Sequence, residues 1–441
     1  MRSLPTRFPI PAAEGACGSG PVAPGASNPV ERPHVGSAAV KWPGQELLDS
    51  PRLARILLSA WGGDSATLVP ACPGAGKSRL VALLSAALAD RASLRVAVAA
   101  QTREQASELA IRIGAVSDRS ALIVSGSRAR AILPGPDGTA TVSVNHARWS
   151  RSRGGEILIA TTARWLYVDP NLGAADILVV DEAWQATYGD VGALGALARQ
   201  IVAVGDPGQI APVVTGSTAR WSGQATGPHQ PAPQALLAAH GDAMTVYELT
   251  DSWRLGPQTS ALVSEHFYPH MPFTSRRPDE AVLAADGSAL PEMMSRQIPA
   301  RHGPTDPELL AAVADRVREL TWHSYRRNGI ETALGGQDIA VVVPHVAQAG
   351  ALRALLADVP GLLIGTVNAL QGLERPAVVA LHPMAGYRHP EPFSLDKGRM
   401  CVTLTRHRAH LTVITDPATE AVLSATSDPS AADALAVLRA L

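Results

Sequence analysis

The sequence predicts an α/β protein built as two successive domains, each with a parallel sheet covered by helices on both faces. The chain has 441 residues, 46% of them apolar and 17% charged, which allows two domains that each bury a core. Its apolar runs are short and continuous rather than alternating, as in parallel strands buried on both faces. Segments of helical length separate these runs, which is typical of a doubly wound fold.

The first domain is predicted over residues 45–245. A flexible tail is expected over 1–44, because that Pro/Gly/Ala-rich stretch has no hydrophobic periodicity. The first helix is predicted over 51–61, with Ser50 as its cap and a proline in its first turn. The other predicted elements are helices at Lys77–Asp90 and Arg103–Ile113, and strands at Thr67–Pro70, Leu94–Ala99, Ile157–Ala160, Ile177–Val180 and Ile201–Val204.

The second domain is predicted over residues 246–441. Its expected elements are strands at Ile339–Val343, Leu362–Thr366, Ala377–Leu381 and Leu411–Ile414, and helices near Glu308–Tyr325 and Val346–Leu356. Two segments rich in Pro, Gly and polar residues, 222–235 and 269–305, are interpreted as loops.

Composition narrows the cellular setting and the kinds of site. The formal net charge of −1 gives no global signal for nucleic acid, although a local basic groove would suffice for that partner. The three cysteines, Cys17, Cys72 and Cys401, are too far apart for a zinc site or a disulfide framework. No apolar stretch has the length of a signal peptide or a membrane span. We therefore expect a cytoplasmic protein with no membrane partner. We also expect a monomer.

A phosphate-binding loop is predicted between the first strand and the next helix. The segment Ala71–Ser78 reads ACPGAGKS, and two glycines allow its backbone to wrap a phosphate at a helix N-terminus. Lys77 is expected to reach the β and γ phosphates, and Ser78 to bind Mg²⁺. A chance Gly-Lys-Ser turn is the alternative, and the strand and helix on either side of the loop argue against it.

Two adjacent carboxylates, Asp181 and Glu182, follow the strand at Ile177–Val180. At the carboxyl edge of a parallel sheet, Asp181 is expected to hold Mg²⁺ and Glu182 to activate the attacking water. Acidic pairs are also common on protein surfaces. Their position about a hundred residues after the phosphate loop favours the functional interpretation.

A series of segments in fixed order resembles the motifs of superfamily 1 helicases. They are Ala100–Arg103 (motif Ia), Ala160–Thr162, Asp181–Gln185 (motif II), Val204–Pro212 (motif III), Leu249–Arg254 followed by Phe267 and Tyr268 (motif IV), Asp338–Gln348, Thr366–Glu374 (motif V) and Val402–Arg406 (motif VI). The resemblance covers roughly residues 65 to 416. Motif V is most similar to the 5′-to-3′ branch that includes the nonsense-mediated-decay helicase.

This resemblance implies two tandem RecA-like P-loop NTPase domains that hydrolyse ATP with Mg²⁺ in the cleft between them. It further implies 5′-to-3′ movement on single-stranded DNA or RNA. Gln209 would sense the γ-phosphate, and Arg254 and Arg406 would be arginine fingers, each worth roughly 10³–10⁵ in rate. Glu374 would lie near the ribose and phosphates. The loop positions that would bind the nucleotide are Pro73, Gly74, Ala75, Gly76, Lys77 and Ser78.

The resemblance also places strand contacts. Thr102, Thr162 and Thr366 fall where family members bind the sugar-phosphate backbone, which carries no sequence information. Two Arg/Trp clusters are further candidates: Arg148, Trp149, Arg151 and Arg153 form the first, and Arg220 with Trp221 the second. Solvated basic loops with a packed Trp are the alternative interpretation of both clusters.

Departures from the family pattern leave other functions open. The glutamine that reads adenine in many members is missing before the loop, where Gln45 is the nearest amide, so we expect use of other nucleoside triphosphates too. The stretches between motifs are too short for large accessory domains, which favours an ATP switch that does not unwind as the alternative. A separate loading protein is a further possible partner. A non-enzymatic scaffold is disfavoured because the side chains needed for hydrolysis are all present.

Overall fold

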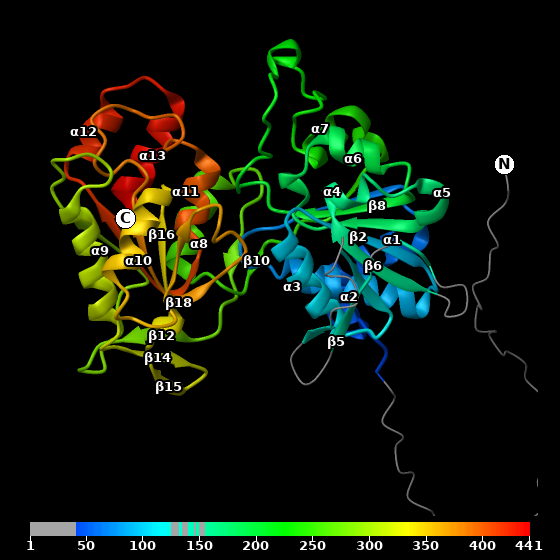
Figure 1. The fold of residues 1–441 in the computed structure, drawn as a ribbon, viewed down its shortest axis with the longest axis horizontal. Helices are drawn as coiled ribbons and strands as arrows, with labels where there is room; N and C mark the ends of the chain where they lie inside the picture. Colours follow the sequence, from blue (N-terminus) through cyan, green and yellow to red (C-terminus); the bar gives the residue numbers. More distant parts are fainter. Residues whose placement is uncertain (1–40, 125–131, 135–139, 145–146, 150–154) are drawn as a thin grey trace, which may run out of the picture. The chain divides into compact units, whose positions relative to one another are not determined.

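A nine-stranded sheet organises the first part of the chain in the computed structural model, which describes residues 41–124, 132–134, 140–144, 147–149 and 155–441 (Figure 1). The strand order is β4-β5-β3-β6-β2-β7-β8-β1-β9, and every pairing is parallel except that of β4 with β5. The strands are β1 (Ala66–Pro70), β2 (Arg95–Ala100), β3 (Ser120–Ile123), β4 (Ile132–Pro134), β5 (Ala140–Val144), β6 (Glu156–Thr161), β7 (Ala175–Val180), β8 (Ala198–Gly205) and β9 (Thr245–Val246).

Helices cover both faces of this sheet. Along β2, Val96 and Val98 pack into the core beneath three helices, whereas Ala97 and Ala99 pack into the core on the opposite face. The helices on the first face are α1 (Pro51–Gly62), α2 (Lys77–Arg91) and α3 (Arg103–Gly114). Those on the second face are α4 (Thr162–Trp165), α6 (Tyr188–Leu194) and α7 (Ala232–His240); α5 (Pro170–Gly173) precedes β7. Because strands such as β1 are buried along their whole length, their sequences are continuous apolar runs.

A second, five-stranded sheet is parallel throughout, in the order β13-β19-β18-β16-β17. Its strands are β13 (Met293–Gln297), β16 (Ile339–Val343), β17 (Leu363–Thr366), β18 (Arg375–Leu381) and β19 (His407–Thr415). One face packs against α9 (Pro307–Leu320) and α10 (Val346–Leu355), and the other against α8 (Pro257–Phe267), α11 (Lys397–Leu404), α12 (Ala418–Ser424) and α13 (Pro429–Ala440). The predicted α/β class, with parallel sheets covered on both faces, is confirmed.

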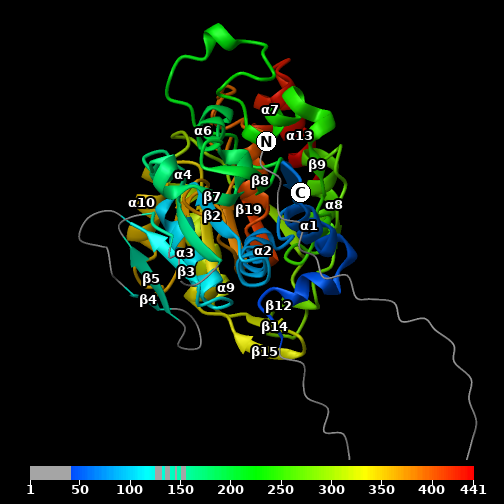
Figure 2. The ribbon, with the colours of Figure 1, turned by 90° about the vertical axis from the view of Figure 1, so that its right-hand side faces the viewer.

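Two small sheets complete the described fold. β10 (Asp251–Ser252) pairs in parallel with β11 (Thr274–Ser275), and β12 (Glu280–Leu283), β14 (Ser324–Arg327) and β15 (Ile330–Ala333) form an antiparallel sheet. The three antiparallel strands lie side by side in both views (Figures 1 and 2). No helix within the described parts of the chain is long and apolar enough to cross a membrane.

Three expectations about secondary structure are wrong. The segment 269–305 contains β11, β12 and β13, and the segment 222–235 contains the start of α7. The helix expected up to Tyr325 ends at Leu320, and Tyr325 lies in β14, where it pairs with Val282. These strands form through pairing with distant segments, so their short and partly polar sequences carry little local signal.

The loops at the carboxyl ends of the first sheet's parallel strands meet along one edge. β1 leads into the phosphate loop, β7 into Asp181, and β8 into the loop that starts at Asp206. Ser50 stands at the predicted N-cap position of α1, although its side chain makes no capping hydrogen bond. Helix α2 begins at Lys77 directly after Gly76, whose φ of 86° suits a residue without Cβ. The fold therefore brings three separate chain segments to one site.

Candidate nucleotide-binding site

The phosphate loop is tightly enclosed by the segment that follows β10. Gly74 has a φ of 76°, and a Cβ there would lie 2.4 Å from Cβ of Arg254. The Ser252 hydroxyl donates to the carbonyl of Pro73 over 2.7 Å, and the Trp253 amide donates to the carbonyl of Gly74 over 3.0 Å. These contacts hold Arg254 beside the loop, and only glycine fits at position 74.

Lys77 is the first residue of α2 and is almost wholly buried. Its Nζ donates to Oδ2 of Asp206 over 3.3 Å. Burial alone would lower the pKa of Lys77, but the charge of Asp206 and then that of Glu182 raise it overall. The lysine therefore stays cationic at the N-terminus of α2, where loop amides could bind a phosphate.

Ser78 and the two carboxylates lie together beneath the loop. The Ser78 hydroxyl donates to Oδ2 of Asp181 over 3.4 Å, and Oδ1 of Asp181 accepts the Glu182 amide over 3.0 Å. Burial and the charge of Glu182 raise the pKa of Asp181 to about 7. Two carboxylates kept this close in a buried site favour a cation between them and Ser78.

Glu182 adopts the left-handed conformation with φ of 50°, which is uncommon for a residue with a side chain. Such a backbone costs roughly 1–3 kcal/mol and persists where the surrounding fold enforces it. Asp181 before it and Ala183 after it are both buried, so the turn cannot relax toward solvent. The strained turn orients the Glu182 carboxylate into the site.

Asp206 is the centre of a hydrogen-bond cluster after β8. Its Oδ2 accepts from Nζ of Lys77 and, over 2.7 Å, from Nε2 of Gln209. Oε1 of Gln209 in turn accepts from Nε2 of Gln371 over 3.2 Å. The Gln209 amide is therefore held at both ends, between the first sheet and the loop after β17.

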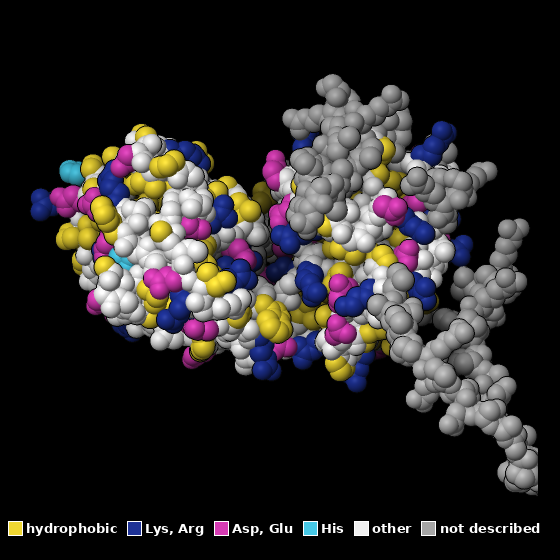
Figure 3. Space-filling view, turned by 90° about the horizontal axis from the view of Figure 1, so that it is seen from below, with side chains coloured by type: hydrophobic (Ala, Val, Ile, Leu, Met, Phe, Trp, Pro, Cys, Tyr) yellow, Lys and Arg dark blue, Asp and Glu magenta, His cyan; other side chains and the backbone are white. Residues whose placement is uncertain are grey.

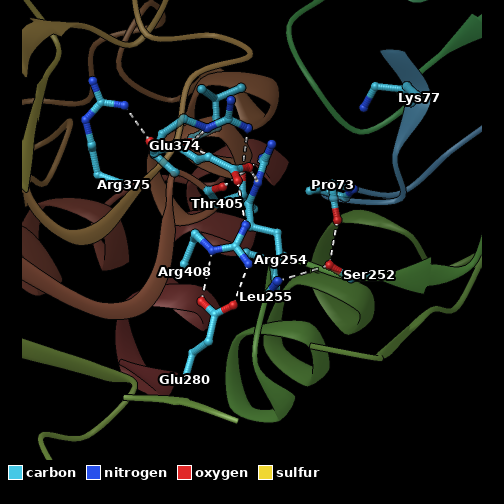
Figure 4. Close-up of polar contacts among 12 residues, drawn as sticks. Pro73, Lys77, Ser252, Arg254, Leu255, Glu280, Glu374, Arg375, Thr405 and Arg408 are labelled. Atoms are coloured by element: carbon cyan, nitrogen blue, oxygen red, sulfur yellow. Dashed lines mark hydrogen bonds and ion pairs between the residues drawn. The ribbon is translucent and has the colours of Figure 1, made fainter. Parts of the chain in front are cut away.

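Arg254 and Arg408 both bind Glu374 (Figure 4). Arg254 forms an ion pair with Oε2 of Glu374, and Arg408 donates to Oε1 over 2.7 Å. Arg408 also donates to the buried carboxylate of Glu280 over 2.5 and 2.9 Å. Burial would raise the pKa of Glu374, but Arg254 and Arg408 outweigh burial and hold the pKa at about 2. Glu374 is thus a charged clamp for two arginines.

Arg406 is 1% exposed. Its Nε donates to the carbonyl of Val402 over 3.2 Å, and its Nη2 to the hydroxyl of Thr405 over 2.9 Å. Burial and the nearby charge of Arg254 lower the pKa of Arg406 to about 10. At neutral pH it remains a cation whose hydrogen bonds within the described part of the chain go to a carbonyl and a hydroxyl, which suits an anionic ligand.

All of the predicted hydrolytic side chains line one cavity of about 400 Å³. They are Lys77, Ser78, Asp181, Glu182, Gln209, Arg254, Glu374 and Arg406. A neighbouring cavity of about 1180 Å³ shares Gly76, Arg79 and Trp253 with the first. In this arrangement the loop amides and cations could hold phosphates, and the Ser78 hydroxyl with the Asp181 carboxylate could hold a metal ion.

The predicted strand contacts have more varied surroundings. Thr102 is exposed and caps α3, where its hydroxyl oxygen accepts the Gln105 amide over 3.2 Å. Thr366 ends β17 and accepts the Ala369 amide over 3.4 Å. Thr162 is 6% exposed, and its hydroxyl donates inward to the side chain of Gln101 over 3.2 Å. Contact with a strand stays a prediction for all three.

The Arg/Trp clusters are only partly described. Arg151 and Arg153 lie outside the described residues, and Trp149 packs against the core of the first sheet. Arg220 lies over the Trp221 ring at 4.8 Å, in a segment that extends away from the sheet in two views (green, Figures 1 and 2). Basic and acidic side chains are interspersed on the face drawn in Figure 3, in keeping with the net charge of −1.

Three site residues had no role in the sequence interpretation. Asp206 and Trp253 lie in the same motifs as Gln209 and Arg254, but only the latter two were predicted to have a role. Aromatic residues make up only 4% of the chain, so a Trp beside a motif arginine was an available signal. Arg408 follows motif VI by two positions, and only its contacts with Glu280 and Glu374 reveal its place.

Comparison with known proteins identifies the family of the chain. Two family models, each described as an AAA domain, match residues 55–232 and 234–418. DNA polymerase alpha-associated DNA helicase A of Schizosaccharomyces pombe is 35% identical over 96 residues, which are 21% of this chain and 14% of that protein. DNA-binding protein SMUBP-2 of Mus musculus is 26% identical over 252 residues, which are 55% of this chain and 25% of that protein. The chain therefore matches no more than a quarter of either relative's length.

Among solved structures, an Arterivirus nonstructural protein 10 helicase in complex with DNA is 14% identical with a TM-score of 0.45, over 87% of this chain and 65% of that one. The helicase of PRRSV is 15% identical with a TM-score of 0.41, over 82% of this chain and 54% of that one. Family membership rests on the two AAA domains in tandem and on the ordered motifs. The chain belongs to the superfamily 1 group of P-loop helicases.

Proposed function

We propose that this protein hydrolyses ATP in response to single-stranded nucleic acid and uses the energy to move along the strand. The observation that carries the proposal is the cavity that gathers the phosphate loop, two carboxylates and two arginines from four distant parts of the chain. Phosphoryl transfer needs positioned cations and a positioned water more than it needs covalent chemistry.

The described residues fit a magnesium nucleotide. Lys77 and the loop amides would hold the β and γ phosphates, while Ser78 and Asp181 would hold Mg²⁺, which neutralises developing charge. Glu182 would take the proton of the attacking water. Arg254 and Arg406 would stabilise the charge on the transferred phosphoryl group.

The stacking site for the base is the least expected part of this proposal. Trp253 is 58% exposed and lines both cavities next to Gly76. An exposed indole beside a phosphate loop can stack on any base, since every base has a π-face. The exposed Trp253 indole and the missing adenine-reading glutamine together support the use of several nucleoside triphosphates.

The nucleic-acid partner follows from family membership. The names of the two relatives describe a DNA helicase and a DNA-binding protein, which supports single-stranded DNA as the first partner to test. RNA as an alternative strand, 5′-to-3′ polarity, a loading protein, a monomeric state and a cytoplasmic location remain parts of the proposal.

The test is an ATPase assay with single-stranded DNA and single-stranded RNA side by side, followed by displacement of a duplex with a 5′ or a 3′ overhang. We expect turnover to rise at least about tenfold with one of the strands, and displacement only with the 5′ overhang. Stimulation without displacement would leave an ATP switch instead. An absence of stimulation by either strand would refute the proposal.

A further inference from the structure

The carboxylate of Asp206 receives four hydrogen bonds, from Lys77, Gln209, Gly208 and Tyr268. Oδ2 accepts from Lys77 over 3.3 Å and from Gln209 over 2.7 Å. Oδ1 accepts from the Gly208 amide over 3.1 Å and from the Tyr268 hydroxyl. A carboxylate has about four lone-pair sites, so this one is fully satisfied. Asp206 itself is 2% exposed, which makes each donor matter.

Tyr268 reaches Asp206 from another part of the fold. It caps the C-terminus of α8, is 3% exposed, and packs edge-on against Phe273 with ring centroids 5.2 Å apart. A Cβ on Gly208 would lie 2.4 Å from the Tyr268 ring, so the ring rests directly on the backbone of the loop after β8. The hydroxyl therefore has a fixed position.

The hydroxyl acts as a donor in this contact. Burial and the charge of Asp206 raise the pKa of Tyr268 well above its ordinary value, so the group stays protonated. Its other contact is with Sγ of the buried Cys401 over 3.7 Å.

We propose that Tyr268 is a positioning residue that lowers the cost of releasing Lys77 from Asp206 when a nucleotide binds. Lys77 must leave Asp206 to reach a phosphate. After it leaves, the buried carboxylate keeps three donors if Tyr268 is present and only two if its hydroxyl is missing. The same hydroxyl fixes Asp206 and, through it, the amide of Gln209.

This inference rests on the proposed function only in that the cavity must bind a nucleotide. It says that Tyr268, at the end of α8, affects the affinity for the nucleotide. The stimulation of turnover by a strand does not measure that affinity. Nucleotide binding without any strand therefore tests the inference, whereas strand-dependent turnover tests the function, so the two can fail separately.

The experiment measures the Kd of a fluorescent ATP analogue and the KM for ATP of the full chain carrying Tyr268→Phe. We expect both constants to rise about three- to tenfold. After Lys77 departs, the buried Asp206 carboxylate keeps three donors in the wild type but only two in the variant. The kcat at saturating ATP should change less than about twofold, since Lys77 is then already on the phosphate. The matched control is Tyr167→Phe, the same change on a ring that is 84% exposed.

A double-mutant cycle separates this role from simple packing. In an Asp206→Asn background the amide holds Lys77 only weakly, so adding Tyr268→Phe should leave the Kd unchanged. Gly208→Ala should reproduce the rise in Kd by displacing the ring, and Gly216→Ala, whose Cβ meets nothing within 4 Å, is its control. An unchanged Kd for Tyr268→Phe, or an equal effect in the Asp206→Asn background, would overturn the proposal.

Discussion

Arg254 and Glu374 form an ion pair that also fixes Arg408, so three charged side chains meet at the wall of the nucleotide cavity. Arg254 stands beside Gly74 of the phosphate loop, whereas Glu374 immediately precedes β18 of the second sheet. A phosphate that attracts Arg254 therefore competes with Glu374. The pair joins the segment beside the phosphate loop to the start of β18.

Loss of the Arg254 side chain should lower the rate of hydrolysis much more than the affinity for the nucleotide. We expect Arg254→Ala to lower the kcat for ATP by roughly 10³, because a cation that stabilises the transferred phosphoryl group is lost. The Kd for the nucleotide should rise far less. Steady-state ATPase assays and equilibrium binding measure the two effects, and Arg439→Ala, a change of an arginine whose side chain is 59% exposed, is the control. A comparable loss in kcat for both variants would contradict the assignment.

Glu182→Gln should retain nucleotide affinity and lose hydrolysis. The change removes the base that takes the water's proton, while Ser78 and Asp181 still face each other over 3.4 Å. General bases contribute about 10²–10⁴ in rate, which sets the expected loss in kcat. Rapid-quench measurement of phosphate formation, beside binding of the nucleotide in Mg²⁺, tests this. If Glu182→Gln turned over at the wild-type rate, another group would be the base.

Trp253→Ala should weaken binding of all four nucleoside triphosphates by about tenfold each, because a stacking wall is lost whatever the base. Trp253→Phe should retain most of the affinity. Competition binding with ATP, GTP, CTP and UTP gives the four constants. Trp322→Ala removes a Trp that is 83% exposed and outside both cavities, so it should change none of them. A loss confined to ATP would instead indicate specific reading of adenine.

Buried histidines should make the second sheet sensitive to acid. Burial lowers the pKa of His407 to about 3, and that of His382 and His410 to about 4. As the pH falls, these histidines bind protons near pH 6.5 in the unfolded chain but only near pH 3 to 4 in the folded protein. The free energy of unfolding is therefore highest above about pH 6.5 and decreases as the pH drops toward 4. At pH 5 each histidine should lower the free energy of unfolding by about 2 kcal/mol.

Urea denaturation at pH 7.5 and at pH 5 measures this loss. His382 accepts the Met384 amide through Nδ1 over 3.1 Å, and an asparagine can offer an oxygen there. His382→Asn removes the titrating ring. Its free energy of unfolding should be lower than that of the wild type at pH 7.5, but should fall by about 2 kcal/mol less between pH 7.5 and pH 5. An identical pH dependence in the variant and the wild type would show that His382 is not among the groups responsible.

The sequence by itself determined the parallel strands and the residues of the phosphate loop. Strands such as β16 (Ile339–Val343) are buried on both faces, so their continuous apolar runs are visible without a partner. The loop is equally local, since Gly74, Gly76 and Lys77 act through their own backbone and the start of α2. Motif order added Gln209, Arg254, Glu374 and Arg406.

Only the tertiary structure decided which groups share a hydrogen bond. The contact of Tyr268 with Asp206 spans 62 positions, and that of Arg408 with Glu280 spans 128. Neither residue type nor spacing specifies such pairs, because they depend on how α8, β12 and β19 pack. For the same reason the short strands β11, β12 and β13 escaped the sequence interpretation: pairing with distant segments, not local propensity, makes them strands.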